Sequence, residues 1–149
     1  MPNYNFDRLV APAVNAVLET MFFSVPLGRS EPDTGAANLE ARVSFFGEVS
    51  GILGVRISEA GARSLAASFL GEFEESLSDP QTAQVVCELT NMLCGWIVSN
   101  LASQGCFDLG SPELFSAQSE PPLGMPDFEQ SFAIENGTLT ISLYASVPA

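Results

Sequence analysis

The chain has 149 residues, of which 46% are hydrophobic and only 15% charged, enough apolar material for one packed domain and too much for general disorder. Its net charge is −13, from 18 acidic and 5 basic residues, and such a surface repels nucleic-acid phosphates and anionic membranes. There is no histidine, which excludes serine–histidine and cysteine–histidine nucleophilic pairs, histidine-based zinc sites and imidazole acid–base chemistry. Any proton-handling group must therefore be a carboxylate, unless the reaction needs none.

Three cysteines, Cys87, Cys94 and Cys106, are too few for an all-cysteine tetrahedral zinc site. Cys87 and Cys94 fall in one expected helix, about 10 Å apart along its axis, which is too far for a disulfide. We therefore expect reduced thiols that pack as small hydrophobic side chains. The first residues lack the pattern of a signal peptide, and no stretch has the length and apolarity of a membrane span, so a cytoplasmic location is expected.

Hydrophobic periodicity predicts a helix at the start of the chain, from about Phe6 to Phe23. Pro12 would lie in the first turn of this helix or mark its true start, because proline has no backbone N–H to donate. Residues 27–38 contain turn formers and almost no large apolar side chain, so we expect a loop there.

A hairpin and a short helix are expected next. Residues 39–46 and 52–57 have the composition of strands, and the glycine-containing connection between them favours a hairpin. Ser58 is expected to cap a helix that runs to about Leu70, and Gly71 is expected to end that helix.

The longest expected helix spans about residues 80–103, with Asp79 as its N-cap and Pro80 in its first turn. Gly105 would end it, and a segment rich in proline, residues 111–127, follows.

Two further strands, residues 131–134 and 138–145, are expected around Asn136-Gly137, a strong signal for a type I′ turn. The chain thus reads as helix, two strands, helix, long helix, loop and two strands. This order predicts an α+β fold in which long helices pack on a largely antiparallel sheet, and we expect a single domain over residues 1–149.

The polar side of the long helix carries the residues of greatest chemical interest. On a helical wheel this side holds Gln84, Glu88, Asn91, Gly95 and Ser99. Glu88 and Asn91 are neighbours at i and i+3, and Gly95 leaves backbone without a side chain beside them. The face could be an ordinary solvated surface. However, asparagine costs about 0.5 kcal/mol and glycine about 1 kcal/mol in a helix interior, and close approach of another backbone would explain both choices.

Residues 84–101 resemble the central helix of the CheX branch of the CheC/CheX/FliY chemotaxis phosphatases, with the core Glu88-Leu89-x-Asn91-Met92-x-x-Gly95. Shorter matches follow in the order expected of this family: Val17-Leu18-Glu19-Thr20-Met21, Gly51-x-x-Gly54, Ile57-Ser58-Glu59-Ala60, and Phe107-Asp108-Leu109 with Pro112. The resemblance covers most of the chain and implies a CheC/CheX-like fold.

The resemblance implies one Glu-x-x-Asn site, as in CheX, rather than the two of CheC. Aligning Glu19 with Glu88 suggests an internal pseudo-twofold repeat, but Phe22 stands where the first site would have its asparagine. Two departures concern the second site. Gln84 replaces the aspartate or serine that commonly begins the motif, and Trp96 stands where the family usually has a polar or basic residue. Since Trp96 lies on the apolar face of the helix, we expect it to be a core residue.

The resemblance further implies a phosphatase that hydrolyses the aspartyl-phosphate of a CheY-like response regulator. Asn91 would position the attacking water, and Glu88 would pair with the active-site lysine of the regulator. Gln84, Gly95 and Ser99 would contact this partner. The chain would need no cofactor or metal of its own, because Mg²⁺ is expected in the partner, and a homodimer is implied.

Two other functions are compatible with the sequence. The same helix could bind a response regulator or another signalling partner without hydrolysis, as the departures at Gln84 and Trp96 allow. The chain could instead be a structural interaction domain related to flagellar switch components, with Asn91 incidental. Neither nucleic acid nor a membrane is an expected partner.

Overall fold

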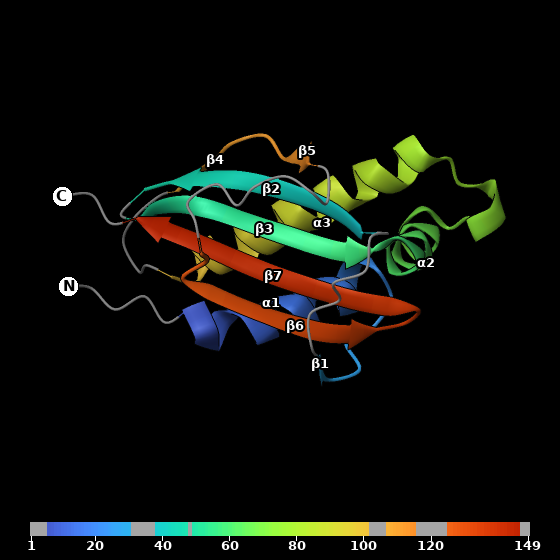
Figure 1. Ribbon diagram of the computed structural model, residues 1–149, viewed down its shortest axis with the longest axis horizontal. Coiled ribbons are helices and arrows are strands. Elements are labelled where there is room, and N and C mark those ends of the chain that lie inside the picture. Colours follow the sequence, from blue (N-terminus) through green and yellow to red (C-terminus); the bar gives the residue numbers. More distant parts are fainter. Residues whose placement is uncertain (1–5, 31–37, 48, 102–106, 116–124, 147–149) are drawn as a thin grey trace.

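The computed structural model describes residues 6–30, 38–47, 49–101, 107–115 and 125–146. They form an α+β fold in which the two long helices lie on one face of a seven-stranded antiparallel sheet (Figure 1). The strand order is β1-β6-β7-β3-β2-β4, and the short β5 also pairs with β2. The fold class expected from the sequence is therefore confirmed.

Two hairpins form the centre of the sheet, as expected: β2 (Asn38–Phe46) with β3 (Ser50–Ser58), and β6 (Phe128–Ile134) with β7 (Gly137–Ser146). The second strand of each hairpin is central, and β3 pairs antiparallel with β7. The two hairpins are thus related by an approximate twofold axis between these strands, the arrangement that an internal repeat would produce.

The prediction of a type I′ turn at Asn136-Gly137 is wrong in its details. Within the turn, Asn136 takes a left-handed conformation with φ of 66°, whereas Gly137 belongs to β7 and pairs with Ile134. Gly137 is needed for a different reason, because a Cβ atom there would overlap the hydroxyl oxygen of Ser58. The hairpin was recognisable from the sequence, but this close contact between distant residues was not.

Short strands occupy the edges of the sheet. β1 (Arg29–Ser30) pairs with β6 on one edge, within the segment expected to be a loop, while β4 (Asp108–Leu109) and β5 (Glu113–Phe115) pair with β2 on the other. The backbone approaches β6 already at Leu27, whose amide donates to the carbonyl of Ala133 (2.7 Å). Strands of two or three residues are too short to show alternation in the sequence, so pairing with an existing edge determines them.

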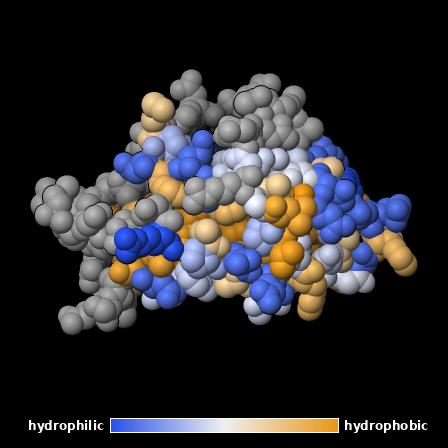
Figure 2. Space-filling view, turned by 90° about the horizontal axis from the view of Figure 1, so that it is seen from below, coloured by the Kyte–Doolittle hydropathy of each residue, from blue (hydrophilic) through white to orange (hydrophobic). Residues whose placement is uncertain are grey.

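The connection between α1 and β1 leaves several large apolar side chains in solvent, among them Phe23, Val25 and Leu27. Figure 2 views the molecule from the side on which β1 lies, and apolar areas appear there between hydrophilic ones. Leu27 is 66% exposed and lies beside β6, toward the edge of the sheet opposite to β2, the strand on which α3 mainly packs.

The described residues also form three α-helices: α1 (Phe6–Met21), α2 (Glu59–Leu70) and α3 (Asp79–Ser99). Pro12 lies inside α1, beyond the first turn in which it was expected. Its side chain is exposed, so the carbonyl of Arg8 that it leaves without a helical partner can bond to water, which limits the cost. None of the helices in the described ranges is long and apolar enough to cross a bilayer.

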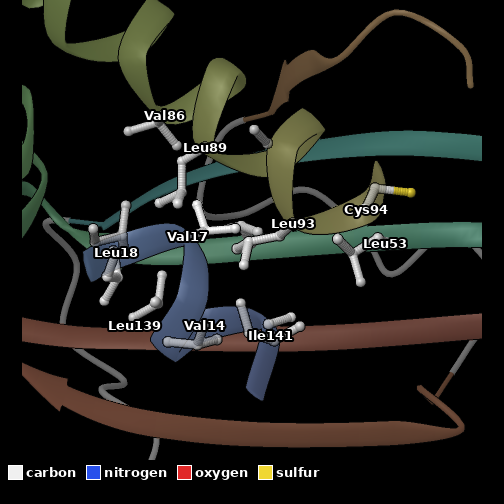
Figure 3. Packing of buried hydrophobic residues seen from close by; sticks show 14 of the residues in the cluster. Val14, Val17, Leu18, Leu53, Val86, Leu89, Leu93, Cys94, Leu139 and Ile141 are labelled. Atoms are coloured by element: carbon white, nitrogen blue, oxygen red, sulfur yellow. The ribbon is translucent and has the colours of Figure 1, made fainter. Parts of the chain in front are cut away.

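The core lies between the sheet and the two long helices (Figure 3). α1 and α3 direct apolar side chains toward one another and toward every second residue of the central strands, as the helical and strand periods require. The buried residues labelled in Figure 3 are Val14, Val17, Leu18, Leu53, Val86, Leu89, Leu93, Cys94, Leu139 and Ile141. This packing fixes which side of α3 faces solvent.

Candidate functional site

The N-cap of α3 is Ser78, one residue before the expected Asp79. Ser78 and Gln81 form a capping box, in which the Gln81 amide donates to Ser78 Oγ (3.2 Å) and the Ser78 amide donates to Gln81 Oε1 (2.9 Å). The Asp79 carboxylate pairs instead with Arg63 of α2. These contacts fix the start of α3 beside the end of α2.

The buried side of α3 is as the helical wheel predicts, with Val85, Val86, Leu89, Leu93 and Ile97 in the core. Trp96, which was expected to be a core residue, is only half-buried and packs against the border of this core.

The helix ends at Ser99, earlier than the expected residue 103. Asn100 is its C-cap, and the side-chain amide of Asn100 donates to the carbonyl of Trp96 (2.8 Å). This local bond satisfies a carbonyl of the last turn, which propensity alone did not indicate. Gly105, the expected end, lies outside the described residues.

The opposite side of α3 holds the predicted site residues together. Gln84, Glu88 and Ser99 are exposed, and Asn91 and Gly95 are half-exposed. Within the described part of the chain, Glu88 has no ion pair and the Asn91 side chain has no hydrogen bond. The carboxylate and the carboxamide, one helical turn apart, are therefore accessible to a partner.

Gly95 is bordered by a side chain rather than by another backbone of this chain. A Cβ atom at Gly95 would lie 3.8 Å from Leu109 Cδ1 of β4, an ordinary van der Waals contact. The described part of the chain therefore does not require glycine here. The hydroxyl of Ser99 donates to the Gly95 carbonyl (2.6 Å), so this polar group is partly used within the helix.

A pocket of about 460 Å³ opens between the last turn of α2 and the first half of α3. Its lining residues are Phe69, Leu70, Gln81, Gln84, Val85 and Glu88, and we refer to it as the α2–α3 pocket. Two predicted site residues, Gln84 and Glu88, belong to it. The contribution of Phe69 and Leu70 could not be predicted, because it depends on how α2 ends against α3.

The described cysteines are free, as expected, and neither is a candidate nucleophile. Burial raises the pKa of the Cys94 thiol to about 12, and burial together with the neighbouring Glu88 carboxylate raises the pKa of Cys87. Both thiols are thus protonated near neutral pH, whereas nucleophilic catalysis needs the thiolate. Among the described residues, no group of three or more acidic or cysteine side chains could hold a metal ion. The chemical groups of this site are a carboxylate and a carboxamide.

The antiparallel sheet with two long helices on one face, and the Glu-x-x-Asn pair on the second of them, define a protein of the CheC/CheX/FliY class. The family described as "Chemotaxis phosphatase CheX" matches residues 39–133, more than half of the chain and including all of α3. The chain belongs to the CheX family. None of the curated proteins compared with this chain matches it.

Solved structures share the fold at low sequence identity. The chemotaxis protein CheX from Vibrio vulnificus is 18% identical, with a TM-score of 0.75 over 95% of this chain and 97% of that chain. A CheC-like superfamily protein from Shewanella is 20% identical, with a TM-score of 0.72 over 97% and 99%. The CheX-CheY-BeF3-Mg+2 complex from Borrelia burgdorferi is 16% identical, with a TM-score of 0.71 over 95% and 99%.

Proposed function

We propose that this protein hydrolyses the aspartyl-phosphate of a CheY-like response regulator, with Asn91 and Glu88 as the acting groups. One observation carries the proposal: both side chains lie on the solvent side of α3, one turn apart and without an intramolecular partner among the described residues. Membership of a chemotaxis phosphatase family supports the reaction class. The complex of the Borrelia burgdorferi relative with CheY supports the partner class.

The proposed reaction needs a positioned water and no covalent intermediate on this chain. An aspartyl-phosphate is already activated, and phosphoryl transfer passes through a loose transition state that depends on positioning and charge. The Asn91 carboxamide can accept from and donate to one water, which it would hold in line with the scissile bond. Water attacks phosphorus as the bond between phosphorus and the aspartate oxygen breaks, the aspartate remains on the regulator as a free carboxylate, and inorganic phosphate leaves with the oxygen and protons of the water. The Mg²⁺ ion belongs to the response regulator.

Glu88 would bind the active-site lysine of the regulator and hold Asn91 in register. All five basic residues of this chain are arginine, so a lysine that pairs with Glu88 must belong to a different protein. Glu88 is exposed, and two of the arginines are engaged elsewhere, Arg42 with Glu40 and Arg63 with Asp79. The net charge of −13 also favours the approach of a receiver domain whose active-site rim carries lysine.

Decay of phosphorylated receiver domains, followed with and without this protein, tests the proposal. Wild type should accelerate the decay of a CheY-like domain. Asn91→Ala should lose the acceleration but still bind the beryllofluoride form of the same domain, and Glu88→Gln should weaken both. Glu135→Gln, which removes another exposed carboxylate at the β6–β7 turn, is the matched control. An unchanged decay rate with Asn91→Ala refutes the catalytic role, and binding by wild type without acceleration indicates a non-catalytic docking protein.

Carbodiimide cross-linking tests the role of Glu88 separately. The reagent joins carboxylates to amines, and because this chain has no lysine, a lysine cross-link at Glu88 can form only with the partner. We expect a cross-linked peptide joining Glu88 to a lysine of the receiver domain. Its absence in a complex that cross-links at other carboxylates would contradict the proposed ion pair. We also expect the homodimer that the family resemblance implies, which light scattering would test.

A further inference from the structure

The α2–α3 pocket lies directly beside the proposed site and shares the Glu88 side chain with it. Its apolar surface comes from Phe69, Leu70 and Val85, and its polar rim comes from Gln81, Gln84 and Glu88. We propose that this pocket receives a large apolar side chain of the response-regulator receiver domain, and that Leu70 therefore determines how tightly the partner binds. This inference rests on the proposed function and names a second contact of the same complex.

The pocket is held in shape by contacts within the chain. Phe69 stacks on Phe22, which follows α1, with ring centroids 4.9 Å apart. Val85 is buried, and the Gln81 side chain is fixed by its hydrogen bond to the Ser78 amide. A side chain entering such a preformed pocket loses little free energy to rearrangement of the protein, which favours tight binding.

The α2–α3 pocket is close enough to Asn91 to be covered by any partner protein that binds at Asn91. Gln84 precedes Asn91 by seven residues, which is about 10 Å along a helix. A standard protein interface covers roughly 800 Å² on each partner, equivalent to a disc of about 16 Å radius. A receiver domain centred on Asn91 therefore covers Gln84 and the pocket it lines.

The chemistry of the lining selects an apolar occupant. Leu70 is a large hydrophobic residue with 40% of its surface exposed, so covering it removes apolar surface from water. A polar side chain could find hydrogen-bond partners only at the rim, and it would be desolvated where it met Phe69 and Leu70. Apolar anchors seated in pockets near the centre of an interface commonly carry much of the binding energy. A receiver domain with its lysine on Glu88 would place neighbouring side chains over this surface.

Steady-state dephosphorylation with three variants tests the inference, using a receiver domain that the wild-type protein dephosphorylates. Leu70→Gln removes the apolar surface and keeps helix propensity and charge. Leu70→Met keeps an apolar side chain. Leu27→Gln makes the same change at an exposed leucine on the opposite edge of the sheet. Circular dichroism and denaturant unfolding check that each variant folds.

We expect Leu70→Gln to raise KM about tenfold with kcat unchanged, while Leu70→Met and Leu27→Gln stay within about twofold of wild type. A tenfold change corresponds to about 1.4 kcal/mol, reasonable for part of a leucine side chain. If wild type is active, Asn91→Ala is inactive and Leu70→Gln has a normal KM, the pocket assignment alone is overturned. A change in self-association without a change in KM would assign the pocket to a second copy and also overturn it. Failure of wild type to act on any receiver domain would overturn the proposed function first.

Discussion

Gly95 offers a perturbation whose effects on stability and on function are expected to have opposite signs. It lies in the interior of α3, one turn after Asn91, where glycine weakens a helix relative to alanine by about 0.5–1 kcal/mol. The new Cβ atom of Gly95→Ala would meet Leu109 Cδ1 at 3.8 Å, which is ordinary contact and adds no strain. We therefore expect a gain of about 0.5–1 kcal/mol in the free energy of unfolding, or roughly 2–4 °C in Tm at the upper value.

The same methyl group should impair function. It would project on the half-exposed side of the helix that carries Asn91, where a partner backbone has to approach closely for the carboxamide to reach its water. We expect weaker binding of the receiver domain and slower dephosphorylation, although the protein itself is more stable. Urea unfolding and the decay of the phosphorylated receiver domain, measured on the same preparation, provide both readouts.

Gly61→Ala is the matched contrast, because it makes the same change in α2 at a crowded position. A Cβ atom there would lie 2.9 Å from Ser58 Oγ and 3.0 Å from Ile134 Cδ1, so we expect a loss of stability. If Gly95→Ala also lost stability, Gly95 would be needed for packing within the chain. If it were more stable and fully active, Gly95 would not lie at the interface with the partner.

Three further predictions concern contacts that hold the fold. Ser58→Ala should lower the free energy of unfolding in urea by about 2 kcal/mol, since Ser58 Oγ accepts hydrogen bonds from the amides of both Gly61 and Thr138 (3.3 Å each). A loss below about 0.5 kcal/mol, the size of an ordinary surface change, would contradict this. Gly137→Ala should cost more, about 3 kcal/mol, because its Cβ atom would overlap that hydroxyl, and a stable variant would refute the close contact. Because the folded-state pKa of Cys94 is raised to about 12, stability should fall above pH 9, by up to about 1.4 kcal/mol per pH unit, as the unfolded thiol ionises. Cys94→Val should remove this part of the pH dependence, and parallel curves for the two proteins would contradict it.

Local signals were sufficient for the features that local interactions determine. Ser58 caps α2 and Gly71 ends it in a left-handed conformation with φ of 66°, as their residue types predict. The apolar stripe of α3 fixed its buried side, and with it the exposure of Glu88 and the half-exposure of Asn91. A site defined by one helix face is predictable because the helical period alone relates its residues.

Features that depend on distant residues were not predictable in the same way. The N-cap of α3 is an exception, because Ser78 with Gln81 three residues later has the local spacing of a capping box and pointed to Ser78 rather than Asp79. The pairing of the Asp79 carboxylate with Arg63 of α2, by contrast, follows no local pattern. Likewise Leu70 carries no functional signal of its own, and its place in the α2–α3 pocket follows from the contact of two helices.

Phe22 explains why α1 has no Glu-x-x-Asn site, and it also supports the α2–α3 pocket beside the site on α3. Glu19 is exposed on α1 as Glu88 is on α3, but Phe22, at the position of the asparagine, is fully buried and stacks on Phe69. Phe69 in turn lines the α2–α3 pocket beside Glu88. Replacing Phe22 by asparagine would therefore not restore a first site: it would bury an amide, leave a cavity costing about 3–5 kcal/mol, and withdraw support from the pocket of the second. The approximate twofold symmetry of the fold is thus broken by packing in a way that supports a single site on α3.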